Sequence, residues 1–595
     1  MSEVRDAGRH AGYEPPASAA PMPRRSPEAA GAAEAGARVP LVALVAWFAI
    51  VTGLIDAGIL LFQRFALGRI TGQSPDGIWM APLAYCALFA LPALAIAAAT
   101  ARASERSAFA WRVGALAFLS WGSILLFLYM RLHKAALVAL AIGLAVQTAR
   151  IGLAHRGGFA RLVRRTVPAL AALVALLAAA LPGGRWLAER RALAAVPAPP
   201  AGAVNVLLII LDTVRAHSLG LHGGARANTP ELERLAREGV MFERAITAAP
   251  WTLASHASMF TGHPVHDLGV GWERSLDGRY PTLAEVLRDR GYLTAGITAN
   301  FYYTTWESGL QRGFVHYDAQ PVTARQALKS TALGQLLEHV VLGLTLEERT
   351  SDRRTAEEIN RDFLRWLRDA GDHPFFAFIN YIDAHLPYEP PEPFRSRFHA
   401  DSSDVHAYEA SIAYADQQVG ALVDSLARLG VLRNTLVIVT SDHGELLGEH
   451  GLHGHTRGMY LPLLHVPLVM MLSERLPAGA RVPGVASLAD LPATVLDIVQ
   501  PGAADALPGR SLAARWRAGA AAGDTVLSEY SVGGVKSLFD GRLHYVQYPN
   551  GREELYDVTT DPEETRDLAA VSRPEMLDGL RARMRAVRAA ARAGQ

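Results

Sequence analysis

The chain has 595 residues, of which 50% are hydrophobic and 19% are charged, so it is too long for a single core and too apolar for a disordered or fibrous protein. Its 58 basic and 57 acidic residues nearly cancel, and no local basic patch stands out, so we expect no nucleic-acid partner. The single cysteine, Cys86, lies in an apolar segment. We therefore expect no intrachain disulfide, and no Cys-based metal site elsewhere.

The first third of the chain predicts a membrane protein. Residues 1–39 are rich in Ala, Pro, Gly and Arg and show no apolar periodicity, which predicts a disordered cytoplasmic tail. Each of the apolar segments that follow is close to the ~20 residues that a helix needs to cross a bilayer. They lie at about 40–62, 77–100, 111–130, 135–154 and 167–183. Residues 40–184 are therefore predicted to form five transmembrane helices, with a buried soluble helix as the alternative for the Ala-rich fifth.

The distribution of basic residues predicts the orientation. The loop after the second segment contains Arg102 and Arg106, and the loop after the fourth contains four arginines between residues 156 and 165, whereas the opposite loops hold fewer. Cytoplasmic loops carry the excess of Lys and Arg. We therefore expect a multi-pass protein of the cell (inner) membrane, with everything after residue 184 extracytoplasmic. Asp56 lies in mid-segment, either as a satisfied interhelical contact or in a functional role.

Residues 185–203 start charged and helical and end in a Pro-rich stretch, which predicts a semi-rigid extended linker, and residues 204–500 predict a doubly wound α/β domain. The aliphatic run at 204–211 is typical of a strand buried on both faces of a parallel sheet. Similar runs at 293–298, 375–382 and 435–440 alternate with helical patterns at 229–240, 281–291, 355–370 and 405–429. Residues 501–595 contain short strand patterns, an Asn550-Gly551 hairpin signal and a helical pattern at 572–592, which together predict a small α+β subdomain.

Polar residues follow three of the predicted strands: Asp212, His385, and the pair Asp442 and His443. Carboxylates and imidazoles at one edge of a sheet can converge on a single divalent cation, for which Zn, Mn, Mg and Ca are equally suitable. The hydroxyl-rich segment 252–262 precedes a helical stretch. It predicts either a nucleophile at a helix N-terminus or simply a helix cap, with Thr252 or Ser255 as the capping residue.

Several motifs follow one another along the chain: Asp212-Thr-Val-Arg215, the Thr252 to Gly262 segment, Asn380 to Tyr388, Ser441 to Gly451, Gly454-His455, and Glu554 to Glu563. In this order they resemble the sulfatase-like group of the alkaline phosphatase superfamily, over residues 204 to about 570. The resemblance implies a metal held by Asp212, Asp442 and His443, with the nucleophilic oxygen of Thr252 as a further ligand.

The chain departs from that pattern at the nucleophile. Sulfatases that use formylglycine make it from Cys or Ser and carry a nearby Arg, whereas this chain has Thr252 and His256 at these places. A Thr nucleophile and five spans resemble lipoteichoic acid synthases and lipid A phosphoethanolamine transferases. The Gly448-Glu-His-Gly451 motif and the Glu554 to Asp557 motif are instead similar to arylsulfatases.

These features predict a metal-dependent enzyme that cleaves or transfers a phospho group through a covalent Thr252 intermediate, on an extracytoplasmic lipid-linked or glycan substrate. We expect His385 and His455 to bind the non-bridging oxygens or protonate the leaving group, and His256 to orient the anion. The alternatives are a sulfatase acting on sulfate esters, and a non-catalytic membrane protein that keeps the fold. The oligomeric state stays open.

Overall fold

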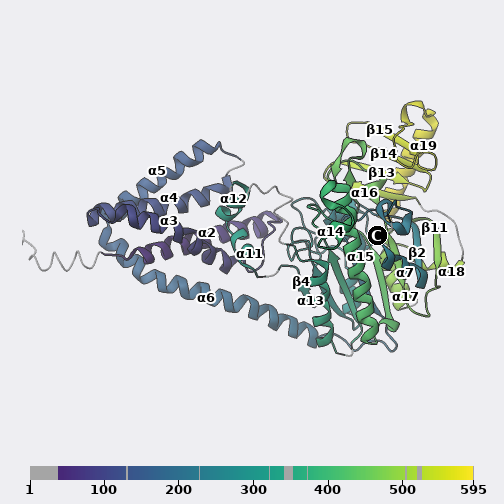
Figure 1. Ribbon diagram of the computed structural model, residues 1–595, viewed down its shortest axis with the longest axis horizontal. Coiled ribbons are helices and arrows are strands. Elements are labelled where there is room, and N and C mark those ends of the chain that lie inside the picture. The colour runs from purple at the N-terminus through teal and green to yellow at the C-terminus, as the bar shows by residue number, and fades with distance from the viewer. Residues whose placement is uncertain are drawn as a thin grey trace, which may run out of the picture.

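The computed structural model describes residues 38–593 except 129–130, 227, 321, 341–352, 372, 501, 503–505 and 519–524. The predicted tail lies outside the described residues apart from its last two positions. A bundle of long helices stands beside a domain built on a large β-sheet, and the long helix α6 runs from the bundle to that domain (Figure 1). The helices of the bundle are α2 (Leu41–Leu67), α3 (Gly77–Thr100), α4 (Glu105–Leu125), α5 (Lys134–Ala154) and α6 (Arg156–Ala194).

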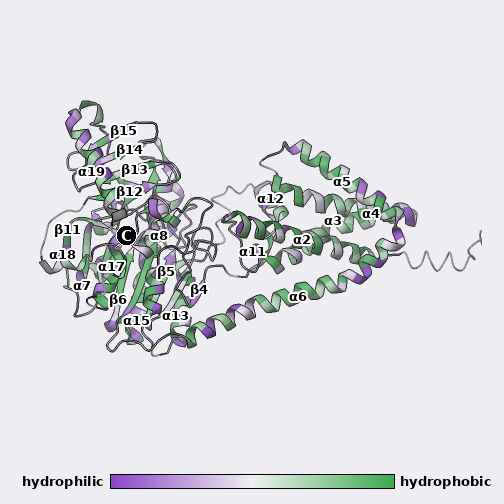
Figure 2. Cartoon of the chain, turned by 180° about the vertical axis from the view of Figure 1, so that it is seen from behind, coloured by the Kyte–Doolittle hydropathy of each residue, from purple (hydrophilic) through white to green (hydrophobic). Residues whose placement is uncertain are grey.

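Within the described part of the chain, five helices are long and apolar enough to cross a membrane, as the sequence predicts. Apolar residues cover the outside of the bundle, and α6 is apolar along the bundle but polar toward the sheet domain (Figure 2). Leu91 and Leu94 on α3, for example, are 75% and 69% exposed. The fifth helix begins at Arg156, earlier than the expected start at about residue 167, and it continues to Ala194 through the charged part of 185–203 that the sequence predicts to be helical.

The second domain is organised around a nine-stranded sheet with the order β11-β2-β10-β6-β1-β5-β3-β4, and β9 (His465–Val466) pairs with β2. Its centre consists of the four predicted strands, all parallel: β1 (Asn205–Leu211), β3 (Leu293–Thr298), β5 (Phe375–Tyr381) and β6 (Thr435–Thr440). The outer strands are β2 (Val240–Ile246), β4 (His316–Asp318), β10 (Leu468–Met471) and β11 (Ala480–Ser487).

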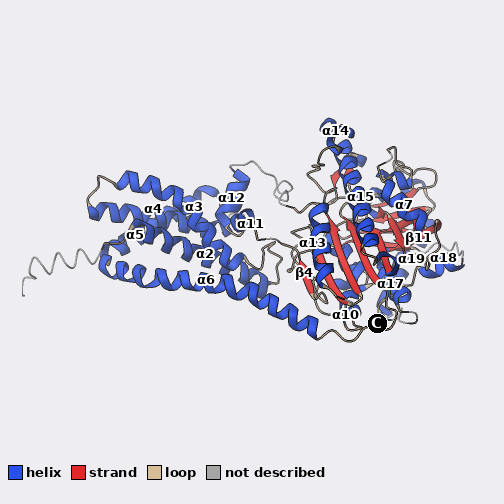
Figure 3. Cartoon of the chain, turned by 60° about the horizontal axis from the view of Figure 1, so that its bottom comes forward, coloured by secondary structure: helices blue, strands red, loops and turns tan. Residues whose placement is uncertain are grey.

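Helices cover both faces of this sheet (Figure 3). One hydrophobic core joins the sheet to α8 (Thr252–Thr261), α10 (Leu283–Arg288) and α17 (Leu491–Val499). A second core joins it to α7 (Pro230–Glu238), α13 (Ala356–Asp369) and α15 (Asp404–Arg428). Alternate residues of β1 point into the two cores, since Leu208 belongs to the first and Leu207 to the second. The predicted doubly wound α/β architecture is therefore confirmed.

The sheet is mixed rather than wholly parallel. Strand β10 runs antiparallel to both β6 and β2. The segment between β6 and β10 contains no helix longer than the four residues of α16 (Leu461–Leu464), so no crossover carries the chain back to start a parallel strand. Strand β11 was not expected, because Pro483 and Gly484 interrupt its pattern and produce a register shift between Val482 and Val485.

The C-terminal region forms a four-stranded antiparallel sheet followed by a helix, which agrees with the expected α+β subdomain. The strands are β12 (Val526–Tyr530), β13 (Val535–Phe539), β14 (Leu543–Gln547) and β15 (Glu553–Asp557), and the helix is α19 (Pro574–Ala593). The predicted hairpin joins β14 to β15, and Gly551 in its turn has a φ of 84° that favours glycine. The helix α18 (Ala513–Ala518) precedes this sheet.

Besides α6, two described segments connect the bundle to the sheet domain. The first is the loop 68–76 between α2 and α3, where the backbone N–H groups of Thr71 and Gly72 both donate to Glu307, at 2.7 and 2.9 Å. The second is the pair of helices α11 (Ala324–Lys329) and α12 (Ala332–Val340), which pack on the bundle. Asp56 accepts hydrogen bonds from the Tyr85 hydroxyl and from the N–H of Ala332, so it makes an interhelical contact and also caps α12.

Candidate active site

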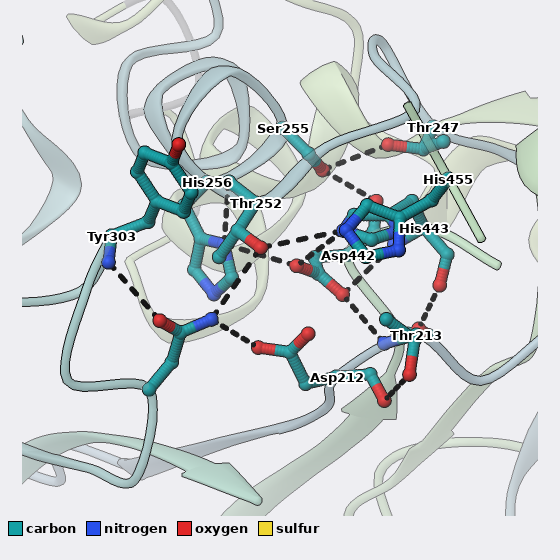
Figure 4. Close-up of polar contacts among 12 residues, drawn as sticks. Asp212, Thr213, Thr247, Thr252, Ser255, His256, Tyr303, Asp442, His443 and His455 are labelled. Carbon is teal, nitrogen blue, oxygen red and sulfur yellow. Dashed lines mark hydrogen bonds and ion pairs between the residues drawn. The ribbon is translucent and has the colours of Figure 1, made fainter. Parts of the chain in front are cut away.

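The centre of the site lies at the carboxyl ends of β1 and β6. These strands are parallel neighbours, so Asp212, just after β1, and Asp442 and His443, just after β6, emerge at the same edge of the sheet. All three side chains are fully buried, and their ligand atoms lie within 4.8 Å of one another (Figure 4). The strand ends therefore meet as expected, with two carboxylates and one imidazole facing a common point.

This cluster fits a divalent cation. Oδ1 of Asp212 and Oδ2 of Asp442 are buried and have no hydrogen-bond partner among the described residues. Burial and the nearby Asp212 raise the pKa of Asp442 well above its ordinary range, because two buried carboxylates repel each other. Burial and the neighbouring His455 lower the pKa of His443, so its imidazole stays neutral and can act as a ligand. A divalent cation would offset the carboxylate repulsion and use both partnerless oxygens.

Thr252 borders the cluster at the N-terminus of α8. It is the first residue of this helix and is 2% exposed, with its Oγ1 3.3 Å from Nε2 of His443. The N-cap residue is Trp251, whose side chain makes no capping hydrogen bond, so neither Thr252 nor Ser255 is the N-cap. Ser255 instead donates to the backbone carbonyl of Asp442 at 2.6 Å and ties α8 to the end of β6. The helix N-terminus favours negative charge beside Thr252.

His385 and His455 lie on the open side of the cluster. His385 follows β5, and its Nδ1 contacts the backbone carbonyl of Leu386 at 2.7 Å. His455 follows the short strand β8 (His453–Gly454), and its Nδ1 is 3.0 Å from Oε1 of Glu445. The ring centroid of His455 lies 5.2 Å from that of His385 and 4.6 Å from that of His443. Burial and the adjacent His455 lower the pKa of His385. Both rings line the same cavity as Thr252.

His256 has a different position. It is fully buried in α8, one turn after Thr252, and its Nδ1 donates to the Thr252 carbonyl at 2.8 Å. Its ring packs edge-on against Phe260 and Phe378. It is not among the residues that line the cavity, and its Nδ1 lies 3.7 Å from Oδ2 of Asp442, so the ring borders the carboxylate cluster rather than the cavity wall.

Two asparagines that the sequence reasoning missed complete the cluster. The Nδ2 atoms of Asn300 and Asn380 donate to Oδ2 of Asp212 at 2.9 and 3.2 Å, and Asn300 also reaches Oγ1 of Thr252 at 3.5 Å. These contacts hold one Asp212 oxygen in place and leave the other free to bind a ligand. Asn300 comes two residues after β3, so the strand-end argument applied to Asp212 would have found it.

The site opens into a cavity of about 540 Å³. Thr252, His385 and His455 lie on its sheet-domain side. Other walls come from the connecting segments, namely Thr71 to Gln73 of the α2–α3 loop and residues of α11 and α12 such as Lys329 and Gln335. No local sequence pattern predicts this, because it depends on the docking of the bundle against the sheet domain.

Comparisons with known proteins agree with this geometry. Residues 204–501 match the family model of the sulfatases. The chain is 25% identical over 447 residues to an arylsulfatase of Clostridium perfringens, which covers 61% of this chain and 90% of the relative. It is 25% identical over 488 residues to arylsulfatase K of Bos taurus, with 69% and 85% covered. It is also 27% identical over 320 residues to iduronate 2-sulfatase of Mus musculus, with 42% and 56% covered.

Solved structures show the same fold. The phosphonate monoester hydrolase of Agrobacterium radiobacter superposes with a TM-score of 0.53 at 22% identity, covering 65% of this chain and 96% of that one. The corresponding enzyme of Silicibacter pomeroyi gives a TM-score of 0.51 at 20% identity, with 66% and 96% covered. The family indicates a hydrolase that depends on a metal, and these neighbours show that the fold is the same. The matched residues make up half of this chain and contain the whole Asp212, Thr252, Asp442 and His443 cluster, so the chain belongs to the sulfatase family.

Proposed function

We propose that the protein is a membrane-anchored, metal-dependent enzyme that cleaves or transfers a phospho group through a covalent ester on Thr252. The observation that carries this proposal is the position of the Thr252 hydroxyl, 3.3 Å from His443 in the Asp212, Asp442 and His443 cluster and at the N-terminus of α8. A hydroxyl that cannot become formylglycine but lies where an anionic ester would bind is suited to direct nucleophilic attack.

In this proposal each residue of the site has its own role in the reaction. Asp212, Asp442 and His443 would hold the cation, which when bound lowers the pKa of the Thr252 hydroxyl and neutralises charge on the ester oxygens. Thr252 loses its proton to Nε2 of His385, which lines the same cavity, and Oγ1 forms a bond to phosphorus while the bond from phosphorus to the leaving oxygen breaks. Asn300, at 3.5 Å from Oγ1, orients the attacking atom.

His455 is better suited than His385 to protonate the leaving oxygen. Nδ1 of His455 faces the Glu445 carboxylate at 3.0 Å, which stabilises a positively charged ring and directs Nε2 away from that carboxylate. Nδ1 of His385 faces only a backbone carbonyl, and the lowered pKa keeps its ring neutral. Because Nδ1 donates to that carbonyl, Nε2 of the neutral ring carries a lone pair. We therefore propose that His385 accepts the proton of Thr252 and that His455 supplies the proton to the leaving oxygen. Water or an acceptor hydroxyl then releases the phospho group from Thr252.

A sulfatase is the second candidate function. The curated relatives include an arylsulfatase and iduronate 2-sulfatase, and a cation beside a hydroxyl also suits a sulfate ester. The phosphonate monoester hydrolases share the fold and are named for a phosphorus substrate. Thr252 in place of a formylglycine precursor is the feature that favours the phospho group.

The proposal includes a location. The five apolar helices would span the cell (inner) membrane, with the sheet domain outside the cytoplasm, and the substrate would be a lipid-linked or glycan ester presented there. Under this proposal residues 40–184 form the membrane domain, residues 204–500 the catalytic domain and residues 501–595 the C-terminal subdomain, joined by the segment 185–203.

Mass spectrometry of the Thr252 peptide tests the function. The full-length protein is incubated with a phosphodiester or with a sulfate ester and quenched in acid, and the adduct on Thr252 is identified by accurate mass. A phospho adduct that is missing in Thr252→Ala supports the proposal. A sulfo adduct alone would assign the protein to the second candidate, and turnover of a phosphodiester by Thr252→Ala at the wild-type rate would rule out the covalent role.

A further inference from the structure

The α2–α3 loop of the helix bundle reaches the catalytic cavity. Thr71, Gly72 and Gln73 of this loop line the cavity that also contains Thr252 and His385. The loop joins two helices that are long and apolar enough to cross a membrane, whereas Thr252 and His385 belong to the sheet domain. Contacts between the two domains must therefore hold the loop at the cavity.

Two consecutive residues of the sheet domain, Trp306 and Glu307, hold this loop, and we call them the 306–307 clasp. Oε2 of Glu307 accepts from the backbone N–H groups of Thr71 and Gly72, at 2.7 and 2.9 Å. Its Oε1 accepts from the Thr71 hydroxyl at 2.8 Å. The Trp306 indole donates to the Gln73 carbonyl at 2.7 Å. The clasp thus binds all three loop residues that line the cavity.

The buried Glu307 carboxylate couples the two domains. Glu307 is 1% exposed, so the hydrogen bonds from the loop replace the water that its carboxylate loses on folding. Hydrogen bonds to an ionised acceptor are stronger than those between neutral groups. If the loop moved away, the carboxylate would be left buried without these three donors. The clasp therefore fixes the position of the loop.

The backbone of the loop lies directly against an aromatic wall of the cavity. Gly72 has a φ of 69°, and a Cβ at this position would come within 3.1 Å of the ring of Tyr302, which also lines the cavity. Glycine permits both the left-handed backbone and the close approach. The loop and the aromatic wall thus form one continuous surface of the cavity.

The side chains that the connecting segments bring to the cavity include two amides, Gln73 of the loop and Gln326 of α11. An amide can donate and accept hydrogen bonds without carrying charge. Such groups suit the uncharged polar part of an ester, whereas the anionic centre belongs at Thr252 and the cation cluster. This wall is therefore suited to the part of the substrate that does not react.

We propose that the 71–73 segment of the bundle is a substrate-binding wall of the active site, positioned by the 306–307 clasp. The bundle then contributes to substrate binding in addition to its proposed role as an anchor. The inference goes beyond the proposed function, because it holds for a phosphodiester and for a sulfate ester alike. Contacts with the part of the ester that does not react are equally strong in the bound ester and in the transition state, so their loss raises KM and leaves kcat unchanged.

The first test is the kinetics of Glu307→Gln in full-length protein in nanodiscs, with bis(p-nitrophenyl) phosphate and with p-nitrophenyl sulfate. Whichever way the amide turns, its NH2 group faces at least one of the three donors. We expect KM for the ester that is turned over to rise about tenfold, with kcat within about twofold of wild type. An unchanged KM, or a loss confined to kcat, would overturn the proposal.

The matched control is Glu273→Gln. Glu273 pairs with Arg69 of the same loop at 3.1 Å, but its side chain is 61% exposed and does not line the cavity, so this variant should keep the wild-type KM. Trp306→Phe, which loses only the indole N–H of the clasp, replaces Glu307→Gln if that variant does not fold. A rise in KM of the same size in the control would also contradict the clasp.

Hydrogen exchange followed by mass spectrometry tests the clasp without turnover. The N–H groups of Thr71 and Gly72 should exchange faster in Glu307→Gln than in wild type, and at the wild-type rate in Glu273→Gln; unchanged rates in Glu307→Gln would show that no clasp exists. Adding bis(p-nitrophenyl) phosphate to Thr252→Ala should slow exchange across residues 71–73, and no effect would contradict the wall. Wild-type protein that turns over neither ester would sink the proposed function, while the exchange rates still decide the clasp and the wall.

Discussion

Replacing Asp442 with Asn should have opposite effects on the metal-free and the metal-loaded protein. The amide keeps the shape of the side chain and the oxygen that accepts from the N–H groups of Thr213 and His443, at 3.2 and 2.9 Å. It removes one of the two buried negative charges and one cation ligand. Metal-free Asp442→Asn should therefore be more stable than metal-free wild type, although it binds no metal.

The distance between the two carboxylates sets the size of the stability gain in metal-free Asp442→Asn. Ligand oxygens of Asp212 and Asp442 lie within 4.8 Å, so two ionised carboxylates repel each other by roughly 3 kcal/mol at an effective dielectric constant near 20. For a domain of this size, that corresponds to a rise of at most about 6 °C in Tm. The raised pKa of Asp442 leaves part of its population protonated, which reduces the gain to a few degrees. In wild type, a cation at a hundredfold excess over Kd should add about 2.7 kcal/mol, and this increment should vanish in the variant.

Thermal unfolding of the detergent-solubilised protein is followed by tryptophan fluorescence, first with chelator and then with Zn, Mn, Mg or Ca. It gives the Tm of the metal-free protein and the rise in Tm on adding metal, and elemental analysis gives the metal content. Asp416→Asn is the matched control, because Asp416 is also a buried carboxylate but caps α7 away from the site through the N–H groups of Glu231 and Leu232. The control should keep the metal-dependent rise in Tm. Full metal occupancy in Asp442→Asn, or a metal-free variant markedly less stable than wild type, would refute the reasoning.

Three further predictions concern the nucleophile, the membrane orientation and two buried histidines. Thr252→Ala should abolish turnover but retain metal, whereas Thr252→Ser should keep substantial activity because it keeps the oxygen; equal loss in both variants, measured by steady-state kinetics, would point to a structural role. Alkaline phosphatase fused to the C-terminus should be active, and a fluorescent reporter that works only in the cytoplasm should be dark when fused there. The reverse pattern would show that the proposed orientation is wrong. Burial lowers the pKa of His222 to about 3 and that of His465 to about 4. Because both values lie below 6.5, the free energy of unfolding should be highest above pH 6.5 and should fall toward pH 4, by up to about 1.4 kcal/mol per pH unit for each histidine. His222→Gln should show a shallower slope in urea unfolding at pH 5 and 7.5, and an unchanged slope would contradict this assignment.

Much of the fold could be predicted from the sequence, because the signals are local. The length of an apolar run decides whether a helix can cross a bilayer, and the predicted second helix, 77–100, coincides with α3. The aliphatic runs of β1, β3, β5 and β6 predict buried parallel strands without knowledge of their neighbours. Strands that were missed, such as β10 and β11, are short or interrupted, and their pairing with β2 depends on residues far away in the chain.

In the site, too, some residues could be placed from local sequence signals and others only from the tertiary structure. Asp212, Asp442 and His443 could be placed together from the sequence, because parallel strands end at one edge of a sheet and their C-terminal residues must meet there. His256 could not be placed, since the packing of α8 against Phe378 sets its ring beside Asp442, 3.7 Å from Oδ2, and outside the cavity wall. The tertiary structure alone decides the walls of the cavity, because they are surfaces shared by the bundle and the sheet domain, and contacts such as Thr71 with Glu307 join residues 236 positions apart.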